Sequence, residues 1–184
     1  MTHSIVQLKI ETKHIKPAIW RKVLIQSSRS FNELHETIMI LFGFEGVHLF
    51  SFHELGDSAD CSSIKISNAL ESFKTIHYTY DFGDCWEFKI TFEKTVANDN
   101  ALTYPFCIKS KGGMMLEDCG GEYGYKIITD WCRTKSTSSK RILMDYYCDQ
   151  DALEQYADFN PDVFDRKEAN SQLSLLATST NAIY

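Results

Sequence analysis

The chain has 184 residues, of which 43% are hydrophobic and 24% are charged, and its formal net charge is −6 at pH 7. This length and composition are typical of one globular domain with a sizeable core, and they exclude an intrinsically disordered chain. The acidic balance argues against non-specific nucleic-acid binding, because such binding depends on Lys and Arg side chains that neutralise phosphates.

No apolar run in the sequence approaches the roughly 20 residues that a membrane-spanning helix needs. The opening segment MTHSIVQLKI lacks a charged region followed by a long apolar core, so it does not look like a signal peptide. We therefore expect no membrane partner and a cytoplasmic location.

The first elements in chain order are two strands. Val6, Leu8 and Ile10 share one parity within residues 4–12, and the alternation of apolar and polar side chains predicts a strand. A second β-rich segment, residues 18–27, follows after a short polar loop. Together the two segments predict an opening hairpin.

Residues 30–43 carry the strongest helix signal in the chain. Ser30 is followed three residues later by Glu33, which is the pattern of a capping box, in which each side chain bonds a backbone N–H at the helix start. Apolar residues then recur at helical spacing, and Gly43 follows the last of them. The apolar residues are Phe31, Leu34, Ile38, Leu41 and Phe42.

Further strands follow this helix. Residues 47–55 are predicted as a third strand, whereas residues 56–74 are polar and irregular, which indicates a loop or a weak edge strand. Residues 86–93 alternate strictly between apolar and polar side chains, which predicts a half-buried antiparallel strand. Residues 75–80 are its expected partner, so the two segments form a second hairpin.

This order of elements predicts an α+β fold in which a sheet packs against a helix. Two hairpins around helix 30–43 give the element order of a β-grasp-like mixed sheet. A doubly wound α/β fold is disfavoured, because strands and helices do not alternate along the chain.

The second half of the chain differs in composition. Residues 97–125 contain five of the nine glycines and are predicted to form an ordered loop, and helical patterns occupy residues 122–176. We expect a single domain over residues 1–176, with its β-rich part at 4–96, and a frayed tail over residues 177–184.

The six cysteines contain no C-x-x-C pair, and their spacing is wide and irregular. Structural zinc sites usually have close ligand pairs and disulfides are rare in the cytoplasm, so we expect reduced thiols, no metal and no cofactor. The chain also lacks a P-loop, a dinucleotide-binding glycine pattern and an H-E-x-x-H motif. The tripeptide DFG occurs without the other protein-kinase motifs, which excludes a kinase.

Six collinear stretches between about residue 4 and residue 173 carry a resemblance to a known family. They are VQLKI…IKPAIWRKV, FNELHETI, HLFSF, YDFGDCWEFKI, YPFC…EDCGGEYGY and FNPDVFDRKEANSQL. Through them the chain resembles the plasmid pRiA4b ORF-3 family of bacterial and archaeal proteins. The resemblance implies a β-grasp-like α+β fold and a setting on plasmids or other mobile elements, for a family whose biochemical role is largely uncharacterised.

The chain departs from the pattern of this family at four positions. Phe88 stands where the family usually has His after Trp-Glu, Met114 stands where a Cys is common, and Met115 and Leu116 replace two prolines. If the family uses that His and that Cys as metal ligands, this chain has lost both.

The stretch YTYDFGDCWEFKITFE holds the main candidate site. In a two-residue hairpin closed by Phe82 and Gly83, Asp81 and Asp84 would face each other, and facing like charges cost a few tenths to about 1 kcal/mol. Backbone N–H groups, Arg21 or a metal ion would have to offset this cost. Three interpretations stay open: a turn in which Asp bonds the backbone and Gly supplies a positive φ, a binding site for a cationic or polar partner, or a site of metal or acid–base catalysis.

Other candidate residues join this site only if the chain folds back against it. Glu117 and Asp118 precede a glycine turn, where they would also favour the N-terminus of a following helix, and His48 lies in the predicted third strand. We assign no catalytic residue. The hypothetical binding set is Trp20, Arg21, His48, Asp81, Asp84, Trp86, Glu117 and Asp118.

Two classes of function follow from these residues. We favour a non-enzymatic module, associated with mobile elements, that binds a protein partner or a small ligand, because no complete catalytic constellation is present. The alternative is a divalent-metal-dependent hydrolase or nuclease-like enzyme with carboxylate ligands suited to Mg²⁺ or Ca²⁺. It would use Asp81, Asp84, Glu117 and Asp118, and it is excluded if Asp81 and Glu117 lie on opposite sides of the molecule.

Overall fold

The computed structural model of the chain describes residues 4–56, 60–148 and 151–180. Its main feature is a six-stranded sheet with the strand order β3-β4-β5-β1-β2-β6. The strands are β1 (Ile5–Thr12), β2 (Trp20–Gln26), β3 (Phe50–Phe52), β4 (Thr75–Tyr80), β5 (Trp86–Val96) and β6 (Phe106–Lys111). The helices are α1 (Phe31–Phe42), η1 (His53–Leu55), α2 (Ile66–Leu70), α3 (Gly121–Thr134), α4 (Thr137–Tyr147), α5 (Ala152–Gln155) and α6 (Arg166–Thr180).

All five strand pairs of the sheet are antiparallel. The two predicted hairpins, β1–β2 and β4–β5, are confirmed, and β1 joins them by pairing with β5. The predicted α+β class is confirmed. The β-grasp detail is not, because a mixed sheet needs a parallel pair and the five described pairs contain none.

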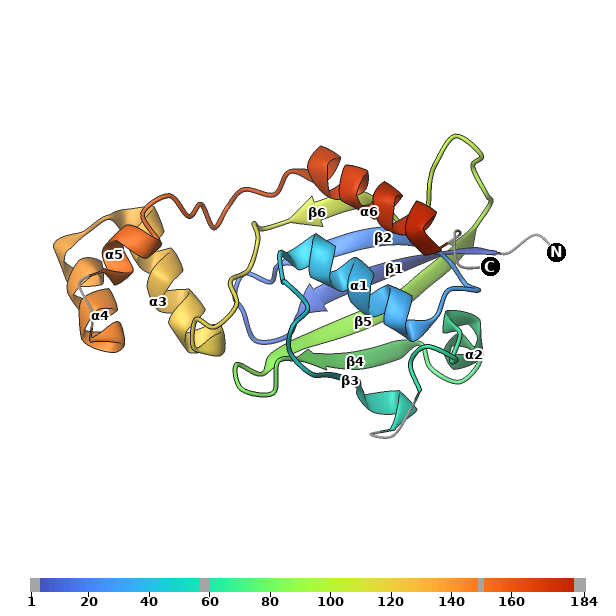
Figure 1. Cartoon of the computed structure of the whole chain (residues 1–184), viewed down its shortest axis with the longest axis horizontal. Helices are drawn as coiled ribbons and strands as arrows, with labels where there is room; N and C mark the ends of the chain where they lie inside the picture. The colour runs from blue at the N-terminus through green and yellow to red at the C-terminus, as the bar shows by residue number, and fades with distance from the viewer. Residues whose placement is uncertain (1–3, 57–59, 149–150, 181–184) are drawn as a thin grey trace.

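Helix α1 lies across one face of the sheet (Figure 1). The capping box predicted at its start is present: the Glu33 N–H donates to Ser30 Oγ at 3.2 Å, and the Ser30 N–H donates to Glu33 Oε2 at 2.7 Å. Gly43 ends the helix with a φ of 86°, a left-handed conformation that glycine adopts without steric cost. The apolar face of the helix packs into the main core.

Replacing Ser30 with Ala is expected to lower the free energy of unfolding by about 1 kcal/mol, because the Glu33 N–H loses its acceptor. Urea unfolding monitored by circular dichroism measures this change. Ser138→Ala, at an exposed position within α4, is the matched control and should stay within about 0.5 kcal/mol of the parent protein. Equal stability of both variants would contradict the capping role.

The predicted alternation of β5 is confirmed, since Trp86, Phe88 and Ile90 are buried while Lys89 between them is exposed. The opposite face of the sheet carries charged pairs, with Lys22 Nζ 2.6 Å from Glu93 Oε1, and a smaller buried apolar cluster of Ile5, Leu24 and Tyr104. The main core therefore lies on the α1 side of the sheet, and the other face is more polar.

Three local predictions differ from the structure. Residues 97–125, predicted as a loop, contain the edge strand β6, and residues 56–74 contain the short helix α2. The third strand is shorter than predicted, because β3 covers only Phe50–Phe52 and the chain then turns into η1. In β6 the apolar pattern is weak, and its pairing with β2 rather than its own periodicity makes it a strand.

The C-terminal helices form two groups in Figure 1. Helices α3, α4 and α5 gather beyond one end of the sheet, whereas α6 returns along β6 and α1. Helix α6 runs through Thr180 and buries Ala177, so it includes the first four residues of the segment expected to be a tail; residues 181–184 lie outside the described chain. Over the described ranges, no helix is both long enough and apolar enough to cross a membrane.

Candidate functional site

The β4–β5 connection is a five-residue loop, residues 81–85, because Tyr80 pairs with Trp86. The expected two-residue hairpin is therefore wrong. The reason is parity: a two-residue loop would place Tyr80 and Trp86 on opposite faces of the sheet, whereas both rings are buried on one face. The loop is closed by the Cys85 N–H, which donates to the Asp81 carbonyl at 2.6 Å.

The two aspartates of this loop do not face each other. Asp81 Oδ1 accepts the N–H of Gly83 at 2.9 Å, within its own turn, whereas Asp84 Oδ2 accepts the N–H of Cys119 at 3.1 Å. The positive φ angles fall on Asp81 and Cys85, at 57° and 55°, and not on Gly83 as expected. One oxygen of each carboxylate therefore accepts a backbone N–H, and for Asp81 this bond lies within its own turn.

The loop packs against the stretch LEDCGG. The Tyr80 hydroxyl donates a hydrogen bond to Glu117, and it accepts the N–H groups of Gly46 at 3.1 Å and His48 at 3.4 Å. A Cβ on Gly121, whose φ is 63°, would lie only 2.3 Å from the Asp84 carbonyl oxygen. Two sequence stretches more than 30 residues apart thus form one structural unit.

The fold also brings His48, Asp81 and Asp118 together. His48 Nε2 lies 3.3 Å from Asp118 Oδ1 and 3.9 Å from Asp81 Oδ2. Asp81 is only 6% exposed, whereas the side chain of Asp118 is 76% exposed, so the cluster opens to solvent on the Asp118 side. Asp81 and Glu117 lie on the same side of the molecule, because Glu117 accepts a hydrogen bond from Tyr80, the neighbour of Asp81. The enzyme alternative would have been excluded by Asp81 and Glu117 on opposite sides, so it stays open.

Tyr80 stays protonated at neutral pH. Burial, and after it the hydrogen bond to Glu117, raises the pKa of Tyr80 to about 12. The phenol therefore remains a donor to Glu117, and Glu117 is not part of the direct cluster of His48, Asp81 and Asp118. Of the four carboxylates in the enzyme alternative, only Asp81 and Asp118 belong to that cluster.

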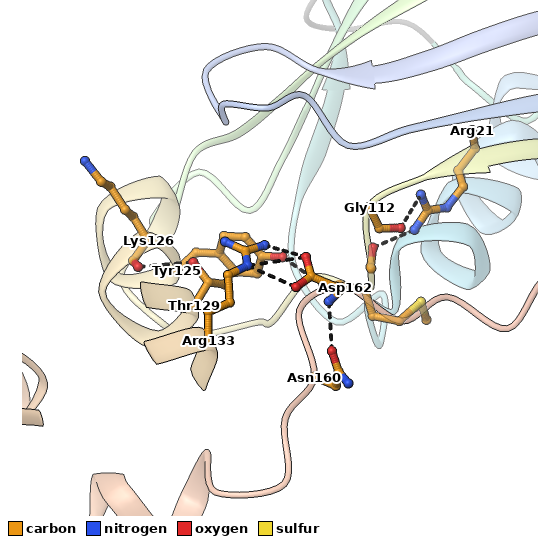
Figure 2. Close-up of polar contacts among 10 residues, drawn as sticks. Arg21, Gly112, Tyr125, Lys126, Thr129, Arg133, Asn160 and Asp162 are labelled. Carbon is orange, nitrogen blue, oxygen red and sulfur yellow. Dashed lines mark hydrogen bonds and ion pairs between the residues drawn. The ribbon is translucent and has the colours of Figure 1, made fainter. Parts of the chain in front are cut away.

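Arg21 is a structural residue and not part of a surface binding site. Its guanidinium is fully buried and donates to backbone carbonyls, some of them shown in Figure 2. It does not stack on Trp20, because successive strand residues point to opposite faces, and it lies 3.8 Å from the centroid of the Phe164 ring. Burial lowers the pKa of Arg21 to about 10, so it remains charged at neutral pH. The accepting carbonyls are those of Trp20, Leu41, Lys111, Gly112 and Gly113.

Trp86 and Trp20 also lie outside the cluster. Trp86 is buried, and its ring contacts those of Phe44 and Tyr125 at centroid distances of 5.9 Å. Trp20 is half-buried at the polar face, where Lys9 Nζ lies 5.7 Å from its ring centroid. Trp86 therefore belongs to the core, and Trp20 belongs to the charged face of the sheet.

A cavity of about 380 Å³ lies where the helical group meets the sheet, and the sequence did not reveal it. Its walls come from the β1–β2 loop (residues 14–19), from Lys111 and Gly112 at the end of β6, and from Pro161 and Asp162. The remaining wall is one face of α3, with residues at helical spacing. They are Glu122, Tyr125, Lys126, Thr129, Asp130 and Arg133.

The charges around this cavity are only partly paired. Arg133 and Asp162 form a two-bond ion pair, with Nη2 to Oδ1 at 2.8 Å and Nε to Oδ2 at 3.1 Å (Figure 2). In the described part of the chain, Lys16, Lys111 and Lys126 have no ion pair. The walls also carry Glu122 and Asp130 without an ion pair, so the unpaired charges number three basic against two acidic.

The sequence model of the family described as "Plasmid pRiA4b ORF-3-like protein" matches residues 4–168. The chain belongs to this family. It is 29% identical over 140 residues to the uncharacterized protein y4hQ of Sinorhizobium fredii, a match that covers 68% of this chain and 72% of the relative. The crystal structure of MM3350, a protein of unknown function from Methanosarcina mazei, is similar, with a TM-score of 0.73 and 28% identity over 91% of this chain and 97% of that chain.

Two of the positions where this pRiA4b ORF-3-like protein departs from the pattern that the resemblance implies, Phe88 and Met114, border the C-terminal end of α1. Phe88 contacts Phe42 with a ring centroid distance of 4.7 Å. Met114 packs closely against Gly43: a Cβ added at Gly43 would lie 2.8 Å from Met114 Cε. The substituted side chains therefore fill core space in this member.

Proposed function

We propose that this pRiA4b ORF-3-like protein is a non-enzymatic binding module that takes a small organic ligand with an anionic group. The observation that carries the proposal is the cavity of about 380 Å³ beside α3. Its volume lies within the range of about 300–1,000 Å³ that is typical of small-molecule sites. The setting that we propose is the cytoplasm of a cell that carries the gene on a plasmid or another mobile element.

The chemistry of the walls supports an anionic ligand. Lys16, Lys111 and Lys126 approach the cavity from three different segments, so a carboxylate or phosphate there would gain charge-assisted hydrogen bonds without breaking an existing ion pair. The buried ring of Tyr125 offers an apolar surface for the rest of the ligand. The ion pair of Arg133 with Asp162 links α3 to the segment that carries Asp162 in the cavity wall.

The favoured class is binding rather than catalysis because the candidate carboxylates lie elsewhere or are already hydrogen-bonded. Asp81 and Asp118 are not among the residues that line the cavity. Asp84 accepts the N–H of Cys119, and Glu117 accepts the hydroxyl of Tyr80. A ligand in the cavity would thus meet lysines, an aromatic ring and the wall carboxylates Glu122 and Asp130, but none of the four carboxylates of the enzyme alternative.

Filling the cavity is expected to weaken ligand binding. The probe is 8-anilinonaphthalene-1-sulfonate, an anionic aromatic dye whose fluorescence rises in an apolar site. Ala18→Phe places a ring in the cavity and should weaken dye binding by at least about tenfold, or 1.4 kcal/mol. Ala101→Phe, in an exposed loop away from the cavity, is the matched control and should bind like the parent.

A second pair of variants tests the charge. Lys126→Gln should weaken dye binding, whereas Lys140→Gln, at an exposed position of α4 outside the cavity, should not. Equal dye affinity in the parent and Ala18→Phe, or no saturable binding by the parent, would overturn the proposal. Native mass spectrometry of the protein purified under non-denaturing conditions then identifies the natural ligand.

A further inference from the structure

The cluster of His48, Asp81 and Asp118 has the dimensions of a metal site. A first-row metal ion binds imidazole nitrogen and carboxylate oxygen at about 2.0–2.2 Å, which places neighbouring ligand atoms roughly 3–4 Å apart. The observed separations from His48 Nε2 are 3.3 Å to Asp118 Oδ1 and 3.9 Å to Asp81 Oδ2. One ligand atom from each of the three residues lies within 4.8 Å of the others. Small side-chain movements alone would bring these three ligand atoms within binding distance of one ion.

A second observation points to a ligand at this place. His48 Nε2 is enclosed by protein and, over the described residues, has no hydrogen-bond partner. Asp81 is buried and uses Oδ1 for the N–H of Gly83, so Oδ2 is the atom that faces His48. Buried polar atoms normally have partners, because leaving them without one costs free energy. A cation between Nε2 and the two carboxylates would satisfy all three groups.

The segments that carry the three ligands are held together without the ion. The Tyr80 hydroxyl accepts the backbone N–H of His48 and donates to Glu117, the neighbour of Asp118, and Asp81 follows Tyr80 directly in the chain. The same buried phenol therefore fixes the positions of all three ligand-bearing segments. Such outer contacts orient metal ligands and raise affinity.

The types of ligand atom select the kind of ion. One imidazole nitrogen with two carboxylate oxygens suits Zn²⁺, Co²⁺ or Mn²⁺, whereas Mg²⁺ and Ca²⁺ prefer oxygen ligands throughout. We propose that His48, Asp81 and Asp118 form a binding site for a divalent first-row transition-metal ion, with a water molecule at the position that opens toward solvent. None of the three residues lines the cavity beside α3, so this site is independent of the proposed function.

Cobalt is the probe that tests this site, because its visible absorption reports both binding and ligand type. Titration of the metal-free protein with CoCl₂ should give one equivalent of bound ion, without the charge-transfer band that thiolate ligands produce. Isothermal titration calorimetry with ZnCl₂ measures the affinity. His48→Gln and Asp118→Asn should each weaken binding by more than about 100-fold, since loss of even an outer-shell contact typically costs 10- to 100-fold.

The matched controls are His53→Gln and Asp145→Asn, which change the same residue types at exposed positions outside the cluster. Both should bind the metal like the parent. Asp118 is largely exposed, so Asp118→Asn keeps the fold, and its thermal unfolding in EDTA should match that of the parent. The proposal is overturned if the parent binds no stoichiometric ion, if the two site variants bind normally, or if a thiolate band shows that cysteine holds the cobalt.

Discussion

Replacing Arg21 with Met is expected to lower the free energy of unfolding by about 4–5 kcal/mol. The guanidinium joins three parts of the molecule that lie far apart in sequence, namely β2, the C-terminal end of α1 and the segment that follows β6. Its shortest contact is from Nη2 to the carbonyl oxygen of Gly113, at 2.6 Å. Met fills most of the volume but donates no hydrogen bond. Several buried carbonyl groups would lose their donor, and hydrogen bonds from charged donors contribute about 1.5–3 kcal/mol each.

Two further variants separate this effect from a simple loss of charge. Lys22→Met, on the same strand, removes only a half-exposed ion pair with Glu93 and should cost less than about 1 kcal/mol. Arg21→Lys keeps the charge but cannot reach carbonyls on several sides at once, so it should be nearly as destabilising as Met. Urea unfolding of the three variants gives the comparison. Arg21→Met within 1 kcal/mol of Lys22→Met would show that the buried hydrogen bonds contribute little.

The stability of the protein is expected to fall by about 3 kcal/mol as the pH drops from about 6.5 to 4. Burial lowers the pKa of His35 from 6.5 to about 4, since its ring packs under α1, stacked on Phe50 at 3.7 Å with Nδ1 2.7 Å from the Tyr78 hydroxyl. Between these two pH values the unfolded chain binds a proton on His35 and the folded chain does not. Each pH unit in this window therefore costs the folded state about 1.4 kcal/mol.

The comparison of parent and His35→Gln isolates this effect. Glutamine can still bond the Tyr78 hydroxyl but does not titrate, so its free energy of unfolding should depend less on pH between 6.5 and 4.5. Below that range, carboxylates whose pKa is lowered in the fold, such as Glu54 and Glu87, also lose stabilising contacts in both proteins. Chemical unfolding at several pH values measures the difference. Parallel pH profiles for the two proteins would contradict a buried neutral histidine.

The parts of the fold that could be predicted from sequence are those fixed by local pattern. The helix start at Ser30 follows from its capping box, and the hairpin strands follow from strict alternation. An odd number of residues in the β4–β5 loop could also have been predicted, because the buried apolar residues of both strands have even numbers. The prediction that Asp81 and Asp84 face each other was wrong, because it did not take this parity into account. Strand β6 could not be predicted, since its pairing partner lies some 80 residues earlier.

The candidate site was only partly visible for a related reason. The residue types of the cluster were recognised, but not which of them meet: Asp84 and Glu117 turn to backbone and phenol groups, while His48 joins Asp81 and Asp118. The cavity could not be predicted from the sequence, because four separate segments form its walls. Only the lining residues of α3 recur at a regular, helical spacing. Tertiary contacts determine both which residues form the cluster and where the cavity lies.

The edges of the sheet limit how a protein partner could bind. Along β6, the side chain of Asn170 bonds both the N–H and the carbonyl of Cys107, and Arg166 donates to the carbonyl of Ile108 at 2.8 Å. The other edge strand, β3, is only three residues long. An extended peptide could therefore find little free backbone to extend this sheet, although strand addition is a common mode of recognition. A protein partner of this family member would have to recognise side chains on the surface, and the same protected edges oppose edge-to-edge aggregation.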